Sequence, residues 1–255
     1  MNSTSILITT FLRPHLLQWN LFSLAKQKIT HPFETIVLND GLPDETESLC
    51  RQYEARLNLK YVFTGQRNIE GSLIYRVPGF ALNIGAKIAS GENLIISCAE
   101  MFHLNNTIEN LIDPLQYSSQ LMCTAIGMDD DGSFLDYLNL HHGDFDSHAF
   151  NYNYATLNTS LPFLMAVRKE KYLAIGGYDE DFTGFAYDDN DFVDRMKLSG
   201  CRLALTQAKT IHLYHVRHDL GMEMSPPYLH NQRLYRDRQG LIIRNNGREW
   251  GKLTP

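Results

Sequence analysis

Three carboxylates fall within four positions of the stretch GFAYDDNDF, residues 184–192. Asp188, Asp189 and Asp191 lie just before apolar residues at helical spacing. Ionised carboxylates this close repel one another, and burial without a partner is unfavourable. One interpretation is a helix N-terminus, where the macrodipole and the free N–H groups favour acids. The other is a catalytic site in which one carboxylate removes a proton and another holds a substrate hydroxyl.

Hydrophobic patterning predicts the elements that must position these acids. Buried strands rich in β-branched residues are expected at 5–13, 33–41, 59–65 and 91–100. Helices with apolar residues at helical spacing are expected between them, at 15–28, 43–57 and 79–90. This alternation indicates βαβ units and a mostly parallel central sheet flanked by helices.

Polar side chains follow three of the predicted strands. Ligands of such sheets bind beyond the carboxyl ends of the strands. The residues at these ends are Thr9, Thr10 and Arg13 after the first strand, Asn39 and Asp40 after the second, and Glu100 after the fourth.

The second half of the chain has a different pattern. Residues 129–160 are polar, aromatic and turn-rich, which predicts a long functional loop. A strand and a short helix are expected over 161–182, a helix over 188–200, and one or two strands over 201–218. No repeat or linker is evident, so one domain is expected. It would comprise a nucleotide-binding half (1–104), an acceptor and catalytic half (105–221) and a basic C-terminal tail (222–255).

Composition is that of an ordinary soluble protein of 255 residues, with 44% hydrophobic and 20% charged residues. No apolar run approaches the ~20 residues of a membrane span, and the N-terminus lacks a basic secretory start. The four cysteines are far apart and form no CxxC pair, which suits a reducing compartment. We therefore expect no transmembrane segment and a cytoplasmic location.

The net charge of −6 gives no general attraction to nucleic acid. One basic segment stands out near the end of the chain. Residues 231–252 carry six Lys and Arg against two acids, which leaves +4. Such a segment is either a solvated helix face or a surface that contacts phosphates.

Six sequence stretches in order resemble inverting nucleotide-sugar glycosyltransferases of the GT-A fold, a Rossmann-like α/β fold. They are LITTFLRP, ETIVLNDGLPDET, ALNIGAKIASGENLIISCAEM, FLMAVRKEKYLAIGGYDEDF, GFAYDDNDFVDRMKLSG and HLYHVRHDLG. The resemblance spans residues 5–221. Within the fold class, these stretches are most similar to family 2 enzymes and to galactosyl- and N-acetylgalactosaminyl-transferases.

The resemblance implies donor contacts at the strand ends. Thr9, Thr10 and Arg13 would border the base and ribose. Asn39-Asp40 stands where the family usually has Asp-Asp before glycine, so Asn39 is a departure that can alter base recognition. Arg217, or His218, would contact the diphosphate.

The family's Asp-x-Asp metal motif aligns with Cys98-Ala99-Glu100. A hard cation, Mn²⁺ or Mg²⁺, would neutralise the leaving nucleotide. Glu100 would bind it and Cys98 would stand at the ribose-contacting place, since a thiol is a poor ligand for a hard ion. His215 stands where galactosyltransferase-like enzymes have a further metal ligand, whereas His212 is expected on the other side of its strand. A metal-independent or inactive enzyme is the alternative.

The opening acids align with the family's Glu/Asp-Asp pair. An inverting transferase needs one general base to take the proton of the acceptor hydroxyl. The resemblance assigns Asp189 as this base and Asp188 as a hydrogen-bond partner of the acceptor, while Asp191 would cap or pair within the helix. Phe185 could stack on the acceptor. The polar loop could contribute further contacts through Asp129 to Asp131, His141, His142 and Tyr152.

The expected function is transfer of a sugar from a nucleotide-sugar, a UDP-sugar above all, to an acceptor hydroxyl on a glycan or another molecule. Hydroxymethylated DNA is an alternative acceptor that the basic segment supports. A nucleotide-sugar-binding protein without catalysis is a second alternative, because Cys98 replaces an acid. A dinucleotide-binding enzyme is a third, but no Gly-x-Gly-x-x-Gly follows the first strand.

Overall fold

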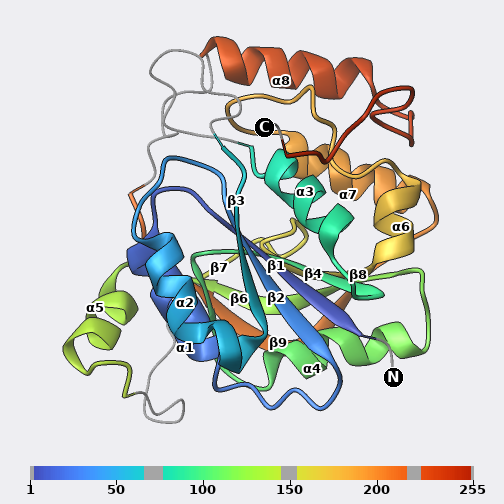
Figure 1. The fold of residues 1–255 in the computed structure, drawn as a ribbon. Helices are drawn as coiled ribbons and strands as arrows, with labels where there is room; N and C mark the ends of the chain where they lie inside the picture. The colour runs from blue at the N-terminus through green and yellow to red at the C-terminus, as the bar shows by residue number, and fades with distance from the viewer. Residues whose placement is uncertain (1–2, 66–76, 145–153, 217–224, 254–255) are drawn as a thin grey trace.

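The computed structural model describes residues 3–65, 77–144, 154–216 and 225–253 (Figure 1). The strands are β1 (Thr4–Thr10), β2 (Phe33–Asn39), β3 (Leu59–Phe63), β4 (Asn93–Cys98), β5 (Met101–His103), β6 (Leu121–Asp129), β7 (Ala155–Thr156), β8 (Leu164–Arg168) and β9 (Arg202–His212). The helices are α1 (Pro14–Leu24), α2 (Thr46–Leu57), α3 (Gly79–Ile88), α4 (Thr107–Ile112), the 3₁₀ turn η1 (Asp113–Gln116), α5 (Ser133–Leu140), α6 (Lys169–Ala174), α7 (Asp188–Leu198) and α8 (Pro226–Asp237).

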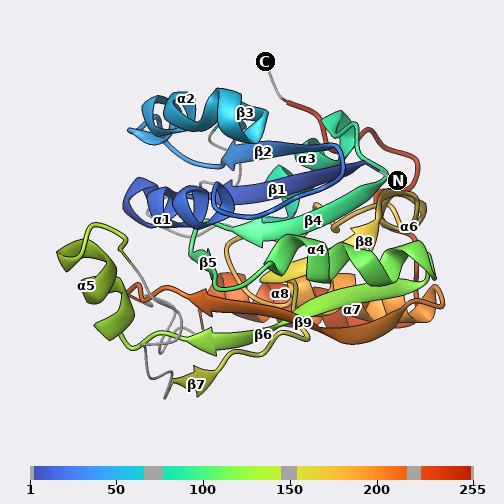
Figure 2. The ribbon, with the colours of Figure 1, turned by 90° about the horizontal axis from the view of Figure 1, so that it is seen from below.

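The strands form one curled sheet with the order β3-β2-β1-β4-β8-β6-β9-β5, and β7 pairs with β6 (Figure 2). The predicted α/β architecture is confirmed. From β3 to β4 all pairings are parallel, as the βαβ pattern predicts. Beyond β4 the sheet is mixed, because β8 runs antiparallel to both β4 and β6. The parallel part brings the carboxyl ends of β1, β2 and β4 to one edge.

Alternation along the strands divides the core between the two faces of the sheet. Ile6 and Ile8 of β1 pack with α1, α2 and α4, whereas Leu7 between them packs with α3, α6 and α7. Each fully buried side chain of this kind contributes about 1.5–3 kcal/mol of transfer free energy. The two helical layers are therefore fixed to opposite faces of the strands that carry the predicted site.

The loop expected over 129–160 contains regular structure, which corrects that prediction. Asp130 accepts hydrogen bonds from the backbone N–H groups of Phe134 (3.0 Å) and Leu135 (3.1 Å), and so caps α5. Phe134 and Leu138 of this helix are fully buried. The polar composition of the whole stretch hid this short helix, in which only Phe134 and Leu138 are buried.

The C-terminal segment is held by ion pairs to buried acids of the loop after α6 and of the first turn of α7. Arg244 lies 3.0 Å from Asp179 and 2.8 Å from Asp191, and both acids are buried. Arg238 and Arg248 pair with Asp179 and Asp181. The part of the basic segment from Arg238 to Arg248, called the strap below, therefore has a structural role and is not a solvated helix face.

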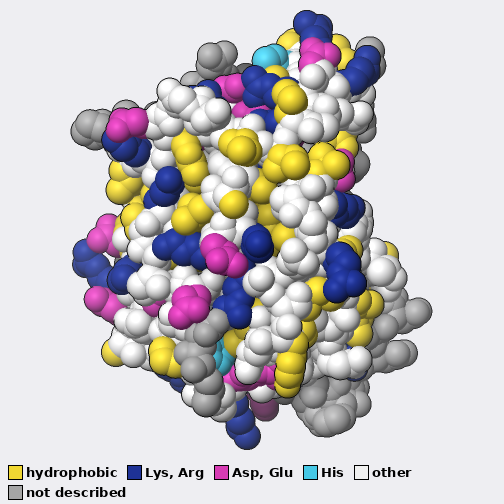
Figure 3. Space-filling view, turned by 90° about the vertical axis from the view of Figure 1, so that its right-hand side faces the viewer, with side chains coloured by type: hydrophobic (Ala, Val, Ile, Leu, Met, Phe, Trp, Pro, Cys, Tyr) yellow, Lys and Arg dark blue, Asp and Glu magenta, His cyan; other side chains and the backbone are white. Residues whose placement is uncertain are grey.

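The strap approaches the turn after α6 so closely that glycine is required at one contact. A Cβ on Gly176 would lie 2.1 Å from the carbonyl oxygen of Arg244, and Gly176 has a φ of +79°. Figure 3 shows the face on the right-hand side of Figure 1, where Lys and Arg side chains are interspersed with acids and apolar residues. Within the described part of the chain, the helices are too short or too polar to cross a lipid bilayer.

Replacement of Arg244 tests the strap. We expect Arg244→Met to lower the free energy of unfolding by roughly 3 kcal/mol, because it leaves buried carboxylates short of a counter-charge. Urea denaturation followed by circular dichroism measures this change. Arg233→Met, at an exposed position of α8, is the matched control and should shift stability by less than about 0.5 kcal/mol. Equal effects of the two variants would contradict a structural role of Arg244.

Candidate active site

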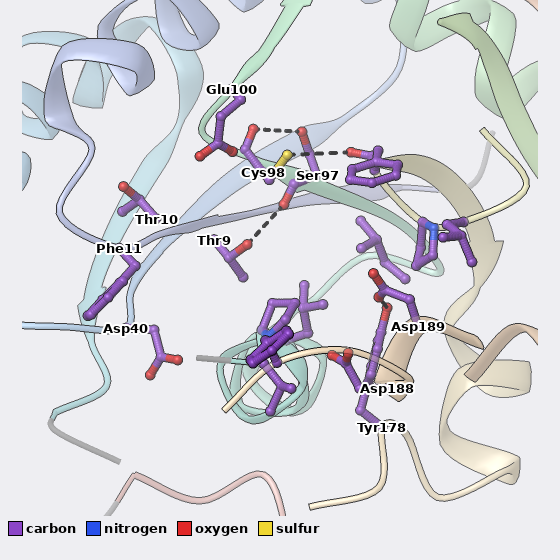
Figure 4. Close-up of a pocket in the computed structure, with 18 of the residues that line it drawn as sticks. Thr9, Thr10, Phe11, Asp40, Ser97, Cys98, Glu100, Tyr178, Asp188 and Asp189 are labelled. Atoms are coloured by element: carbon purple, nitrogen blue, oxygen red, sulfur yellow. Dashed lines mark hydrogen bonds between the residues drawn. The ribbon is translucent and has the colours of Figure 1, made fainter. Parts of the chain in front are cut away.

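A cavity of about 490 Å³ opens at the carboxyl ends of β1 and β4 and is closed on the other side by the start of α7 (Figure 4). Residues predicted from five distant stretches of the sequence line it together. They are Thr9, Thr10, Arg13, Asp40, Cys98, Glu100, Asp188, Asp189 and His215. The volume is of the size that ligand pockets have.

Asn39 is the described residue of the predicted set that does not line this cavity. Its side chain is fully buried and its amide donates to Asp44 (3.2 Å) and to the hydroxyl of Tyr61 (3.1 Å). It therefore faces the start of α2. Asp40, one residue later, lines the cavity and accepts a hydrogen bond from Thr64 at 2.6 Å.

The acids at the start of α7 are placed by an unusual turn. Ala186 and Tyr187 have φ values of +73° and +70°, a left-handed conformation that is uncommon for residues other than glycine. Asn231 of α8 holds this turn, because its amide donates to the carbonyl oxygens of Thr183, Phe185 and Ala186. The turn presents Asp188 and Asp189 to the cavity (Figure 4).

The two acids have different environments. Burial raises the pKa of Asp189 to about 6, although a hydrogen bond from Tyr178 opposes the rise. Burial and the charge of Asp189 raise the pKa of Asp188 well above its usual value. One oxygen of Asp188 has no hydrogen-bond partner among the residues that the structure describes. Burial thus favours a proton on both carboxyl groups, and Asp189 is the one whose ionised form the hydrogen bond from Tyr178 stabilises.

Tyr178 fixes the position of Asp189. Its hydroxyl donates to Asp189 Oδ1 at 3.0 Å, and its ring stacks on Phe192 with centroids 4.4 Å apart. Its backbone N–H and carbonyl both bond to the amide of Asn83 at 2.9 Å. The side chain that contacts the carboxylate is thus held from three directions.

Opposite the acids, the cavity has a charged corner. Arg13 pairs with the buried carboxylate of Glu100. Burial alone would raise the pKa of Glu100, but the charge and hydrogen bond of Arg13, with smaller contributions from His212 and His215, hold it at about 2. Glu100 is therefore ionised throughout the physiological range. Arg13 and Glu100 lie across the cavity from Asp188 and Asp189, with room for a ligand between them.

Cys98, Glu100 and His212 form a group that could hold a metal ion, with ligand atoms all within 4.8 Å of one another. The expectation that His212 faces away from the site is wrong. β9 ends at His212, so strand alternation does not continue to His215, and both side chains line the cavity. Their rings are 5.2 Å apart, and burial lowers the pKa of His215, which favours its neutral form.

Other predicted residues have varied positions. Phe185 lines the cavity, and Asp191 pairs with Arg195 at 2.6 Å, as expected for an acid within its helix. His141 and His142 follow α5 and do not belong to the described cavity lining. Arg217, His218 and Tyr152 lie outside the residues that the structure describes.

Phe11, Tyr178 and Phe163 also line the cavity and were not predicted from the sequence. Tyr178 follows Gly176-Gly177, and an aromatic residue after two turn-forming glycines is a signal that could have marked it. Phe11 extends the strand-end cluster by one residue. Phe163 has no comparable signal, because it lies in an apolar stretch that reads as core.

Two protein-family profiles match this sequence. The sequence profile of glycosyl transferase family 2 matches residues 5–176, and a profile described as "N-terminal domain of galactosyltransferase" matches residues 142–219.

Validoxylamine A glucosyltransferase of Streptomyces hygroscopicus subsp. jinggangensis is 26% identical over 242 residues, covering 80% of this chain and 53% of that protein. Hyaluronan synthase of Pasteurella multocida is 36% identical over 85 residues, covering 33% of this chain and 8% of that protein. The chain therefore spans about half, or less, of the length of these relatives.

Solved structures share the fold at low identity. The structure of GalNAc-T7 with UDP, GalNAc and Mn²⁺ has a TM-score of 0.68 at 15% identity and covers 93% of this chain and 48% of that chain. Staphylococcus aureus TarS 1–349 with UDP-GlcNAc has a TM-score of 0.65 at 19% identity and covers 92% of this chain and 65% of that chain. Since the profile match over residues 5–176 takes in well over half of the sequence, the chain belongs to glycosyl transferase family 2, and its fold is GT-A.

Proposed function

We propose that this chain is an inverting glycosyltransferase that moves a sugar from a UDP-sugar to an acceptor hydroxyl. One observation supports this above all. The acid pair at the start of α7 faces the charged corner of Arg13, Glu100 and the two histidines across one cavity. A general base on one side and groups suited to a diphosphate on the other are what direct displacement at an anomeric carbon requires.

The donor would occupy the strand-end side of the cavity. Thr9, Thr10 and Asp40 lie where a nucleoside would contact backbone and hydroxyl groups, and Arg13 carries the positive charge nearest to a diphosphate. The structural neighbours support this placement, since GalNAc-T7 was solved with UDP and TarS with UDP-GlcNAc. Arg217 remains a proposed diphosphate contact.

Asp189 acts as the base. Its carboxylate takes the proton of the acceptor hydroxyl while the hydroxyl oxygen bonds to the anomeric carbon. The bond from that carbon to the diphosphate oxygen breaks on the opposite face, and the nucleoside diphosphate leaves. A pKa of about 6 suits this task, because the group is ionised at pH 7 and still basic enough to accept the proton. Asp188 is the protonated neighbour and donates a hydrogen bond to another acceptor oxygen.

A divalent cation fits the opposite corner, because Glu100, His212 and His215 offer oxygen and nitrogen ligands there. Mn²⁺ or Mg²⁺ is the cation expected for this family. When bound, it would neutralise negative charge on the leaving diphosphate. Arg13 contributes a fixed positive charge to the same corner.

The alternatives have less support. Arg238, Arg244 and Arg248 form ion pairs with acids of the same chain, so the basic segment offers DNA less charge than its composition indicates. A protein that only binds nucleotide-sugars has no need for two buried carboxyl groups with raised pKa values facing the cavity. We therefore propose catalysis on a glycan or other hydroxyl acceptor.

A panel of nucleotide-sugars tests the proposed function. We expect the protein to release nucleoside diphosphate slowly from one UDP-sugar when a divalent cation is present, and not after chelation. Chromatography of the released nucleotide measures this hydrolysis without knowledge of the acceptor. Failure to bind or hydrolyse any nucleotide-sugar in the panel would reject the proposal.

Replacement of the base should separate catalysis from stability. We expect Asp189→Asn to lower kcat at least about 100-fold and to raise the free energy of unfolding at pH 7 by about 1 kcal/mol. The folded-state pKa is raised, so ionisation at pH 7 opposes folding, and the neutral amide avoids this. Asp194→Asn, a half-exposed acid of the same helix, is the control. Full activity of Asp189→Asn would refute the assignment.

Tyr178→Phe should change the pH dependence. The lost hydrogen bond stabilises the ionised form of Asp189, so its removal raises the pKa of Asp189. Activity falls as pH drops through this pKa, and the acidic limb of kcat/KM should therefore move up by roughly 0.5–1 pH unit. Tyr172→Phe removes a buried hydroxyl that bonds to Asn83 instead and should leave the limb in place. An unchanged limb in Tyr178→Phe would contradict the contact.

A further inference from the structure

The metal group of the cavity has an unusual ligand chemistry. Cys98 ends β4, Glu100 lies in the turn that follows, and His212 ends β9. Each offers one ligand atom, and these sulfur, oxygen and nitrogen atoms lie within 4.8 Å of one another. Ligands of a tetrahedral ion at about 2.0–2.3 Å are roughly 3.3–3.8 Å apart, so small side-chain rotations would close the group around an ion.

His212 is already oriented for such an ion. Its Nδ1 lies 2.9 Å from Asp129 Oδ1, which fixes the ring and leaves Nε2 as the nitrogen for a ligand. A carboxylate behind an imidazole is the usual support of a metal-binding histidine, because it orients the ring and increases its basicity. The edge of Phe163 also packs on this ring, with centroids 5.6 Å apart.

The charges of this corner suit a dication. A thiolate on Cys98 with the carboxylates of Glu100 and Asp129 gives three negative charges, and Arg13 supplies one positive charge. Arg13 contacts one of the two oxygens of Glu100. The thiol proton is released to solvent when sulfur binds the metal, as in other thiolate sites.

From this ligand set we propose that Cys98 is a metal ligand and that the site selects a borderline-soft divalent ion, Zn²⁺ or Co²⁺, over Mn²⁺ and Mg²⁺. Hard ions bind oxygen ligands, whereas a thiolate, an imidazole and a carboxylate form the kind of set that holds zinc. His215 or a diphosphate oxygen would supply the fourth ligand. The inference deepens the proposed function and rests on it for the role of the metal in diphosphate release.

Cobalt spectroscopy tests the sulfur ligand directly. The metal-free full chain, kept reduced with a phosphine, is titrated with Co²⁺. We expect a near-ultraviolet sulfur-to-cobalt charge-transfer band together with intense visible bands of a tetrahedral ion. Zn²⁺ at equal concentration should remove both, and Mn²⁺ should not. Absence of the charge-transfer band in the wild-type protein would overturn the inference.

Two substitutions at the same position and one matched control locate the ligand. Cys98→Ser should abolish the charge-transfer band. Cys98→Asp should also abolish it and lower the ratio of Zn²⁺ to Mn²⁺ affinity at least about tenfold, which calorimetry measures. Cys201→Ala removes a buried thiol outside the cavity and should keep the band. Circular dichroism identifies folded variants, and a band that persists in either folded Cys98 variant would overturn the assignment.

Failure of this inference and failure of the proposed function give different results. Turnover of a UDP-sugar with Mn²⁺, without any charge-transfer band, would overturn the inference and leave the proposed function in place. A band that depends on Cys98, with no hydrolysis of any nucleotide-sugar, would support the metal assignment and reject glycosyl transfer.

Discussion

Two adjacent carboxyl groups at the first turn of α7, Asp188 buried and Asp189 half-buried, impose the main electrostatic constraint on this protein. Removal from water favours a proton on both, the charge of Asp189 adds to this for Asp188, and both pKa values rise. The surrounding structure offsets part of this instability. Tyr178 donates a hydrogen bond to Asp189, and Arg195 and Arg244 pair with Asp191 one turn further along the helix. A helix start that would be unfavourable alone is stabilised by Arg195 of the same helix and by side chains from two other segments.

The opposite wall of the cavity has the complementary chemistry. Arg13 keeps Glu100 ionised, and burial favours neutral His215. The ionisable groups of the two walls therefore differ in proton affinity at the same pH. The carboxyl groups near α7 have raised pKa values, whereas the wall near β4 carries the ionised pair of Arg13 and Glu100. Such separation lets a nucleophile be deprotonated and a leaving group be stabilised within one pocket.

Much of the fold was predictable from the sequence, because strand alternation and helical spacing are local signals. The strand-end residues Thr9, Asp40 and Glu100 were found by one topological rule, and they line one cavity. The antiparallel placement of β8 depends on long-range pairing, which no local pattern reports. The position of His212 does not follow from residue spacing, because it depends on where β9 ends. The ion pairs of Arg244 do not follow from spacing either, because their partners lie far away in the sequence.

The left-handed turn at Ala186 and Tyr187 has a consequence for how this wall of the cavity can diversify. Its shape is imposed from outside by α8, through the amide of Asn231 and through the hydrogen bonds of Tyr228 and Gln232 with the hydroxyl of Tyr187. A lineage that remodels α8 can therefore reshape this wall of the cavity while Asp188 and Asp189 stay as they are. The shape of the cavity and the chemistry of its acids would then be inherited as separable traits.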